Sequence, residues 1–103
     1  MKLKSTLLAA MTLAFATFAQ ADINVGETLS ATGPAASLGI PERNTFQLAP
    51  EKIGGRKVQW IVLDDASDTT AADKNTRKLI GEDKVDVVIG STVTPNSLAM
   101  VDV

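Results

Sequence analysis

The 103-residue chain contains no cysteine, no histidine and no tyrosine, and it has a single tryptophan. Without cysteine it can form neither a disulfide bond nor a thiolate metal site. Without histidine and cysteine it also lacks the commonest nucleophile–base pairs of hydrolases. We therefore expect no catalytic site, no cofactor and no metal in this chain.

The first 21 residues show the three parts of a signal peptide in the correct order. Lys2 and Lys4 form a positive start, Leu7–Phe18 is an apolar stretch, and Ala19–Ala21 is a small-x-small cleavage motif. The alternative is a short membrane anchor, but the apolar stretch is too short to span a bilayer comfortably. We predict that residues 1–21 are removed, that the mature chain begins at Asp22, and that it resides in the periplasm.

Net charge and length limit what the mature chain can be. Lys2 and Lys4 are two of the 10 basic residues, so residues 22–103 carry 8 basic and 12 acidic side chains, a net charge of −4. This charge argues against nucleic acid and anionic membranes as partners. An exported chain this short without disulfides has a weak core, and Met100–Val103 falls within a helical pattern. We expect residues 22–103 to be the N-terminal, incomplete part of a longer ligand-binding domain.

Apolar, β-branched segments alternate with helical patterns along the mature chain. Strands are expected at Ile23–Leu29, Val58–Leu63 and Val85–Ile89. Helices are expected at Pro41–Ala49, at Thr69–Gly81 and from Asn96 onward. This order predicts an α/β fold with a doubly wound parallel sheet and right-handed crossovers. If the first strand lies between the other two, the loops after the first and third strands flank a crevice where such sheets bind ligands.

The second helix has the clearest pattern. Ser67 or Asp68 can cap its start. Its core-facing stripe consists of Ala72, Thr76, Leu79 and Ile80. Asp73 and Arg77 are spaced as an exposed i,i+4 ion pair.

Hydroxyl side chains follow the third strand. This strand stops at Gly90, and Ser91, Thr92 and Thr94 stand between it and the next helix. Neutral hydroxyls beside the N–H groups of a helix start can bind a small carboxylate. Ser30 and Thr32, after the first strand, would face this loop, although turn chemistry explains them as well. The loop is suited to holding a ligand rather than reacting with it.

Four of the side chains that suggest a site also have structural explanations. Thr94, directly before a proline, has the position of a helix N-cap. Asp64 and Asp65 could bind Mg²⁺ at a strand end, but the first strand carries no matching carboxylate pair, so capping and turn chemistry fit better. Trp60, in the middle of a strand, fits a core position better than a ligand-stacking one.

Four stretches in this order, behind the signal-peptide pattern, resemble the periplasmic leucine/isoleucine/valine-binding protein family. They are Ile23–Gly26, Leu29–Gly39, Leu63–Asp68 and Val88–Ser97. These proteins are the type I solute-binding proteins of ABC transporters. The resemblance covers the whole mature segment and implies two α/β lobes, joined by a hinge, that close on a ligand. This chain would supply the beginning of the first lobe.

The resemblance also implies roles for single residues. Thr94 matches the family position whose hydroxyl helps to bind the ligand α-carboxylate. Leu38 matches a position where leucine-binding members carry an aromatic ligand contact. Ser67 and Val93 stand where those members have two disulfide-bonded cysteines, so that disulfide is absent here. The candidate ligand-binding residues are Thr94, Thr92, Ser91 and Leu38.

The function implied by the resemblance is solute binding for an ABC transporter. The protein would capture a branched-chain amino acid or a similar small carboxylate and deliver it to a membrane permease. The alternative is a sensory or regulatory ligand-binding domain of the same fold. A membrane span or signalling module in the full-length protein would favour the alternative.

Overall fold

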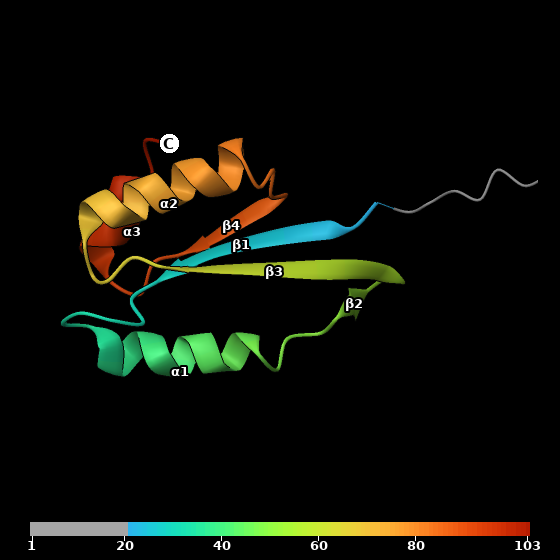
Figure 1. Ribbon diagram of the computed structural model, residues 1–103, viewed down its shortest axis with the longest axis horizontal. Coiled ribbons are helices and arrows are strands. Elements are labelled where there is room, and N and C mark those ends of the chain that lie inside the picture. The colour runs from blue at the N-terminus through green and yellow to red at the C-terminus, as the bar shows by residue number, and fades with distance from the viewer. Residues whose placement is uncertain (1–20) are drawn as a thin grey trace, which may run out of the picture.

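The computed structural model describes residues 21–103, which form one sheet with helices on both faces (Figure 1). The predicted signal peptide lies outside these residues, apart from Ala21. The strands are β1 (Ile23–Leu29), β2 (Lys52–Ile53), β3 (Arg56–Asp64) and β4 (Val87–Gly90). The helices are α1 (Ala36–Phe46), α2 (Thr69–Gly81) and α3 (Thr94–Met100). None of these helices is long and apolar enough to cross a membrane.

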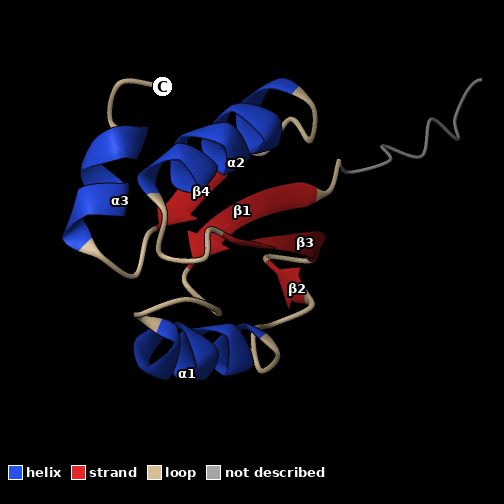
Figure 2. Cartoon of the chain, turned by 60° about the vertical axis from the view of Figure 1, so that its left-hand side comes forward, coloured by secondary structure: helices blue, strands red, loops and turns tan. Residues whose placement is uncertain are grey.

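The sheet confirms the predicted α/β architecture. Its strand order is β2-β3-β1-β4, and β1 pairs in parallel with both β3 and β4. Helix α1 covers one face, and α2 and α3 cover the other (Figure 2). The first strand is therefore central, which meets the condition for a crevice flanked by the loops after the first and third strands, and the carboxyl ends of β1, β3 and β4 meet at one edge.

Strand β2 is a short element that the sequence pattern does not predict. It pairs antiparallel with the start of β3. Gly54 and Gly55 connect the two strands with φ angles of 57° and 78°, which are accessible to glycine without strain. The turn itself is expected from the two glycines, but two residues are too few to show a strand periodicity.

The two faces of β1 are chemically different. Gly26 and Thr28 face α2, because a Cβ on Gly26 would lie 2.8 Å from Leu79 Cδ2 and Thr28 Oγ1 accepts a hydrogen bond from Asn75 of α2. Side chains alternate along a strand, so Glu27 faces α1. A carboxyl group thus lies inside the layer between the sheet and α1.

Helix α1 begins earlier than predicted. It runs over Ala36–Phe46 and contains Pro41, which we had placed at its first position. The chain turns into the helix at Gly33, whose carbonyl accepts from Ala36 N. A Cβ on Gly39 would lie 2.0 Å from the Ser30 carbonyl oxygen, so the helix backbone packs directly against the end of β1. This non-local contact explains a helical turn that the proline obscures in the sequence.

Helix α2 agrees with its prediction except at one position. Asp68 caps it by accepting a hydrogen bond from Ala71 N at 2.8 Å, and Ala72, Thr76 and Leu79 are buried. Ile80 is 46% exposed, so its assignment to the core stripe is wrong. Ile80 follows Leu79 and is therefore rotated by about 100° around the helix axis, away from the contact between Leu79 and Gly26.

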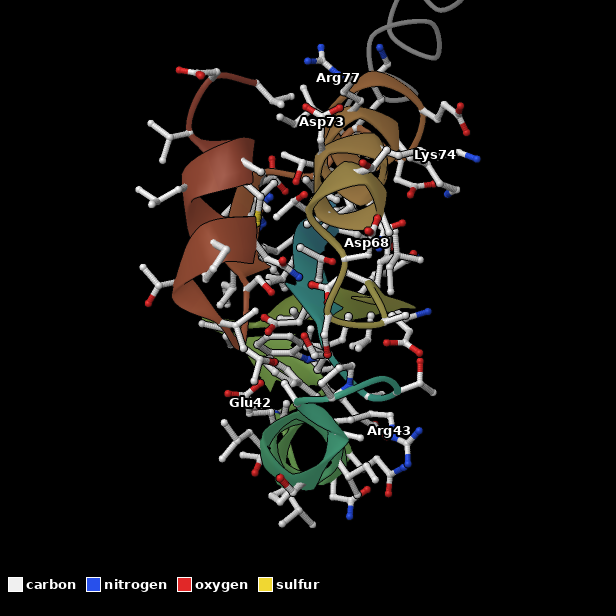
Figure 3. All side chains as sticks on the ribbon, turned by 90° about the vertical axis from the view of Figure 1, so that its left-hand side faces the viewer. Glu42, Arg43, Asp68, Asp73, Lys74 and Arg77 are labelled. Atoms are coloured by element: carbon white, nitrogen blue, oxygen red, sulfur yellow. The ribbon has the colours of Figure 1, made fainter. Side chains whose placement is uncertain are left out.

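The predicted ion pair on the outer side of α2 is present. Arg77 Nε lies 2.9 Å from Asp73 Oδ2, and Figure 3 shows both side chains on the outer surface. Such an exposed i,i+4 pair contributes little to stability, because solvent screens its charges.

Trp60 has the structural role that its position in the strand suggests. Its ring lies 5.7 Å, centroid to centroid, from that of Phe46 in α1, and its Nε1 donates to the Pro50 carbonyl oxygen. Trp60 therefore packs β3 against α1.

Candidate ligand-binding site

Three loops meet at the carboxyl edge of the sheet. They are the loop after β1, the loop after β3 and the loop between β4 and α3 (Figure 1). The parallel pairing of β1 with β3 and β4 brings them together. This is the edge at which open α/β sheets bind ligands.

Asp65 joins the three strand ends. It is fully buried and accepts hydrogen bonds from Ser30 Oγ at 2.7 Å, Ser91 Oγ at 2.6 Å and Thr28 Oγ1 at 3.2 Å. The N–H of Ser67 donates to it as well. Burial raises the pKa of this carboxyl, but the hydrogen bonds, from Ser91 and Ser30 foremost, outweigh burial and hold the pKa below its ordinary value. Asp65 is therefore a charged acceptor at neutral pH.

Asp64 points outward and anchors a turn. It accepts from Thr32 Oγ1 at 2.6 Å and from Ala66 N at 2.9 Å. Burial raises the pKa of Asp64, but the Thr32 and Ala66 hydrogen bonds lower it more, so it lies below the ordinary value. The turn chemistry expected of Asp64 and Asp65 is confirmed, while the capping residue is Asp68. Between residues 21 and 103, no three His, Cys, Asp or Glu side chains are grouped so as to hold a metal ion.

Ser67 ties the loop after β3 to the loop after β1. Its hydroxyl accepts from Ala35 N at 3.0 Å and donates to the Thr32 carbonyl oxygen at 3.1 Å. At a position where the family resemblance suggests a cysteine, the serine thus makes a different cross-connection, to the opposite loop.

The predicted meeting of the loops after β1 and β4 is confirmed for Ser30 and Thr92. Thr92 Oγ1 accepts from Ser30 N at 2.9 Å and lies 2.5 Å from Glu42 Oε2, to which it donates. Thr32 turns away, to Asp64. A hydroxyl carries one hydrogen, so in this arrangement Thr92 donates to Glu42 and Ser91 to Asp65. Both side chains therefore stabilise the loop between β4 and α3 through internal hydrogen bonds.

Thr94 and Leu38 are the two candidates with open side chains. Thr94 is the exposed first residue of α3, and the N-cap is Val93, without a side-chain capping bond. The N-cap explanation of Thr94 is therefore wrong. Instead, Ser97 Oγ ties the helix to the loop by accepting from Ser91 N at 2.9 Å. Leu38, near the start of α1, is 58% exposed.

Sequence reasoning missed Asp65, Glu42 and Ser97 as organisers of this edge. Asp65 carries a usable signal, because a carboxylate after one strand faces hydroxyls after its neighbours. The sequence gives no comparable signal for Glu42, which reaches the site from α1.

The arrangement belongs to a known family of folds and sequences. The family model described as "Periplasmic binding protein" matches residues 22–103. An extracellular ligand-binding receptor from Rhodopseudomonas palustris HaA2 is 53% identical and superimposes with a TM-score of 0.78, over 81% of this chain and 23% of that one. A solute-binding protein of an ABC transporter from Rhodopseudomonas palustris BisB5, solved with 3,4-dihydroxybenzoic acid, is 32% identical with a TM-score of 0.71, over 76% of this chain and 23% of that one.

A curated relative gives the same family. Leu/Ile/Val-binding protein homolog 3 of Brucella melitensis is 32% identical over 109 aligned positions, which include 100% of this chain and 29% of the relative. The chain thus spans less than a third of that protein's length. From the matched sequence, the parallel sheet and the loops at its carboxyl edge, we conclude that this chain belongs to the periplasmic binding protein family, among proteins similar to its Leu/Ile/Val-binding members.

Proposed function

We propose that this chain is the first part of an extracytoplasmic solute-binding protein that captures a small carboxylate and passes it to the permease of an ABC transporter. The observation that carries the proposal is the exposed Thr94 at the carboxyl edge of the sheet, beside a loop whose other hydroxyls are internally bonded. The sensory alternative is not favoured by the comparisons.

The chemistry shared by the relatives' ligands supports a carboxylate. Leucine, isoleucine and valine, named for the Brucella relative, and 3,4-dihydroxybenzoic acid, bound to the BisB5 protein, differ in size and polarity but each carries a carboxyl group. A branched-chain amino acid is our first candidate. Thr94 would donate to the carboxylate, and the exposed Leu38 would contact the apolar part. Ser91 and Thr92 would hold the loop and reach the ligand only after a rearrangement.

A calorimetric titration of the intact protein tests the proposal. The probes are L-leucine, L-isoleucine, L-valine and 3,4-dihydroxybenzoate, with L-leucinamide as the matched compound that lacks the carboxylate. We expect at least one carboxylate to bind and L-leucinamide not to bind. Binding of none of the carboxylates, or equal binding of L-leucine and L-leucinamide, would contradict the proposal.

Replacement of Thr94 by valine should weaken binding of the carboxylate probe by about 10- to 100-fold. The change keeps the side-chain shape and removes one hydrogen bond to a charged group, which contributes roughly 1.5–3 kcal/mol. Because Thr94 is not the N-cap, the melting temperature of the Thr94→Val variant without ligand should match that of the wild type. The control is Thr45→Val, the same substitution near the C-terminal end of α1. This variant should bind the probe normally. Unchanged affinity in Thr94→Val would remove Thr94 from the site.

Export is a separate prediction of the same proposal. In a Gram-negative host the protein should be found in the periplasm with Asp22 as its first residue, because residues 1–21 have all three regions of a signal peptide. Mass spectrometry of a periplasmic extract measures the N-terminus. A mature protein that retains Met1 would refute cleavage.

A further inference from the structure

A carboxyl group lies buried in the central strand of the sheet. Glu27 is 5% exposed, and within the part of the chain that the structure describes its Oε2 has no hydrogen-bond partner. An unpaired buried charge is costly in a protein interior. Such a group is expected to keep its proton.

The nearest charged group makes ionisation of Glu27 harder. Burial, and secondarily the negative charge of Glu42, raise the pKa of Glu27 from 4.5 to about 7. Glu42 comes from α1, which packs on the same face of the sheet. The two carboxyls therefore lie in the same layer, between the sheet and α1.

Within the described residues, no positive charge lies beside Glu27 on the two flanking strands. In the parallel register Glu27 lies between Val62 of β3 and Ile89 of β4, which are apolar. The next charged residue of β3 is Asp64, at the strand end and bonded to Thr32. Figure 3 shows Arg43 pointing to a different side of α1 from Glu42. Within residues 21–103, Glu42 is thus the charged group that acts on Glu27 in this layer.

Glu42 is also connected directly to the candidate ligand site. It accepts the hydroxyl hydrogen of Thr92, and Thr92 in turn accepts from Ser30 N. A change at Glu42 is therefore transmitted to the loop after β4 and to the loop after β1. Both loops line the carboxyl edge of the sheet.

We propose that the proton on Glu27 keeps Glu42 bonded to Thr92, and that its loss at mildly alkaline pH releases the Ser91–Thr94 loop and weakens ligand binding. When Glu27 gives its proton to solvent, two carboxylates repel each other in a medium that screens them poorly. Glu42 is only half-buried and relieves the repulsion by turning toward water. Thr92 then loses its acceptor, and the geometry of the Ser30 N–H bond changes.

The loop movement is measured without ligand. In the ¹⁵N-labelled intact protein, the Ser30 amide resonance should shift between pH 5.5 and 8.5 with a midpoint near the Glu27 pKa of about 7. The shift should be absent in Glu27→Gln, which stays neutral. It should persist in the control Asp73→Asn, which alters an exposed carboxyl. In Glu42→Gln the shift should be strongly reduced, because the neutral amide is not repelled by the Glu27 carboxylate and the link from Glu42 through Thr92 to Ser30 no longer responds. A Ser30 midpoint that is absent from the wild type, or that survives in Glu27→Gln, overturns the proposal.

The effect on binding rests on the proposed function and is measured with the same carboxylate probe. If only the protonated form binds, the affinity at pH 8.5 should be up to about 30-fold weaker than at pH 5.5. Glu27→Gln should show the same affinity at both pH values. If no probe binds at either pH, the proposed function fails. The Ser30 titration still tests whether the Ser91–Thr94 loop responds to the Glu27 proton. Equal wild-type affinity at both pH values refutes the link to binding.

Discussion

Replacement of Asp65 by alanine is expected to lower the free energy of unfolding by about 3–5 kcal/mol, because several hydroxyl donors lose their acceptor at roughly 1–3 kcal/mol each. The carboxylate accepts hydrogen bonds from three hydroxyls, on Thr28, Ser30 and Ser91. Its removal leaves the buried hydroxyls of Thr28 and Ser30 and the half-buried hydroxyl of Ser91 without this acceptor. Chemical denaturation of the intact protein at pH 7, followed by tryptophan fluorescence, measures the loss.

The neighbouring carboxylate provides a matched control for this substitution. Asp64 is exposed and bonds to a turn, so Asp64→Ala should cost no more than about 1 kcal/mol. Because the pKa of Asp65 is lowered from 3.8 in the folded protein, its contribution is present above this value and is lost as pH falls through the folded pKa. The difference between the two variants should therefore shrink in acid. Equal destabilisation by both substitutions at pH 7 would contradict the role of Asp65.

Glu27 should produce the opposite dependence on pH. Its pKa is about 7 in the folded protein against 4.5 ordinarily, so the folded state binds the proton more tightly than the unfolded state between these values. The stability that the proton provides is complete below pH 4.5 and is lost as pH rises through about 7. At about 1.36 kcal/mol per pKa unit, the wild type should lose about 3 kcal/mol on this account.

Glu27→Gln removes this titration, so its unfolding free energy should fall less between pH 5 and pH 8.5 than that of the wild type, by about 3 kcal/mol. Denaturant unfolding of both proteins at each pH gives the double difference, which cancels the cost of burying an amide instead of a carboxyl. Asp73→Asn, at the surface pair, should retain the wild-type pH dependence. Parallel pH profiles for wild type and Glu27→Gln would show that Glu27 has no raised pKa.

Local sequence patterns account for the main elements of the fold. The β-branched runs predicted β1, β3 and β4. A cap at Ser67 or Asp68, followed by the stripe of Ala72, Thr76, Leu79 and Ile80, predicted α2 from Thr69 to about Gly81, in agreement with its observed bounds. Helix α1 was misplaced because its start depends on a contact between Gly39 and the Ser30 carbonyl, which no local pattern contains.

The candidate site was predictable in position but not in its internal bonding. The run of hydroxyls after β4 located the loop correctly. Which hydroxyl remains free to bind a ligand depends on acceptors that are distant in sequence. Asp65 accepts the hydrogen bond of Ser91, and Glu42 accepts that of Thr92. These partners lie 26 and 50 residues away along the chain. The sheet topology and the packing of α1 bring them together.

A crystal structure of the intact protein with its highest-affinity carboxylate probe is the most direct test of the proposed binding site. We predict that the ligand carboxylate lies at the carboxyl edge of the sheet, within hydrogen-bonding distance of Thr94 Oγ1, and that Asp65 keeps its bonds to Ser30 and Ser91. A carboxylate bound away from Thr94, with the Thr94 hydroxyl still facing solvent, would contradict the account.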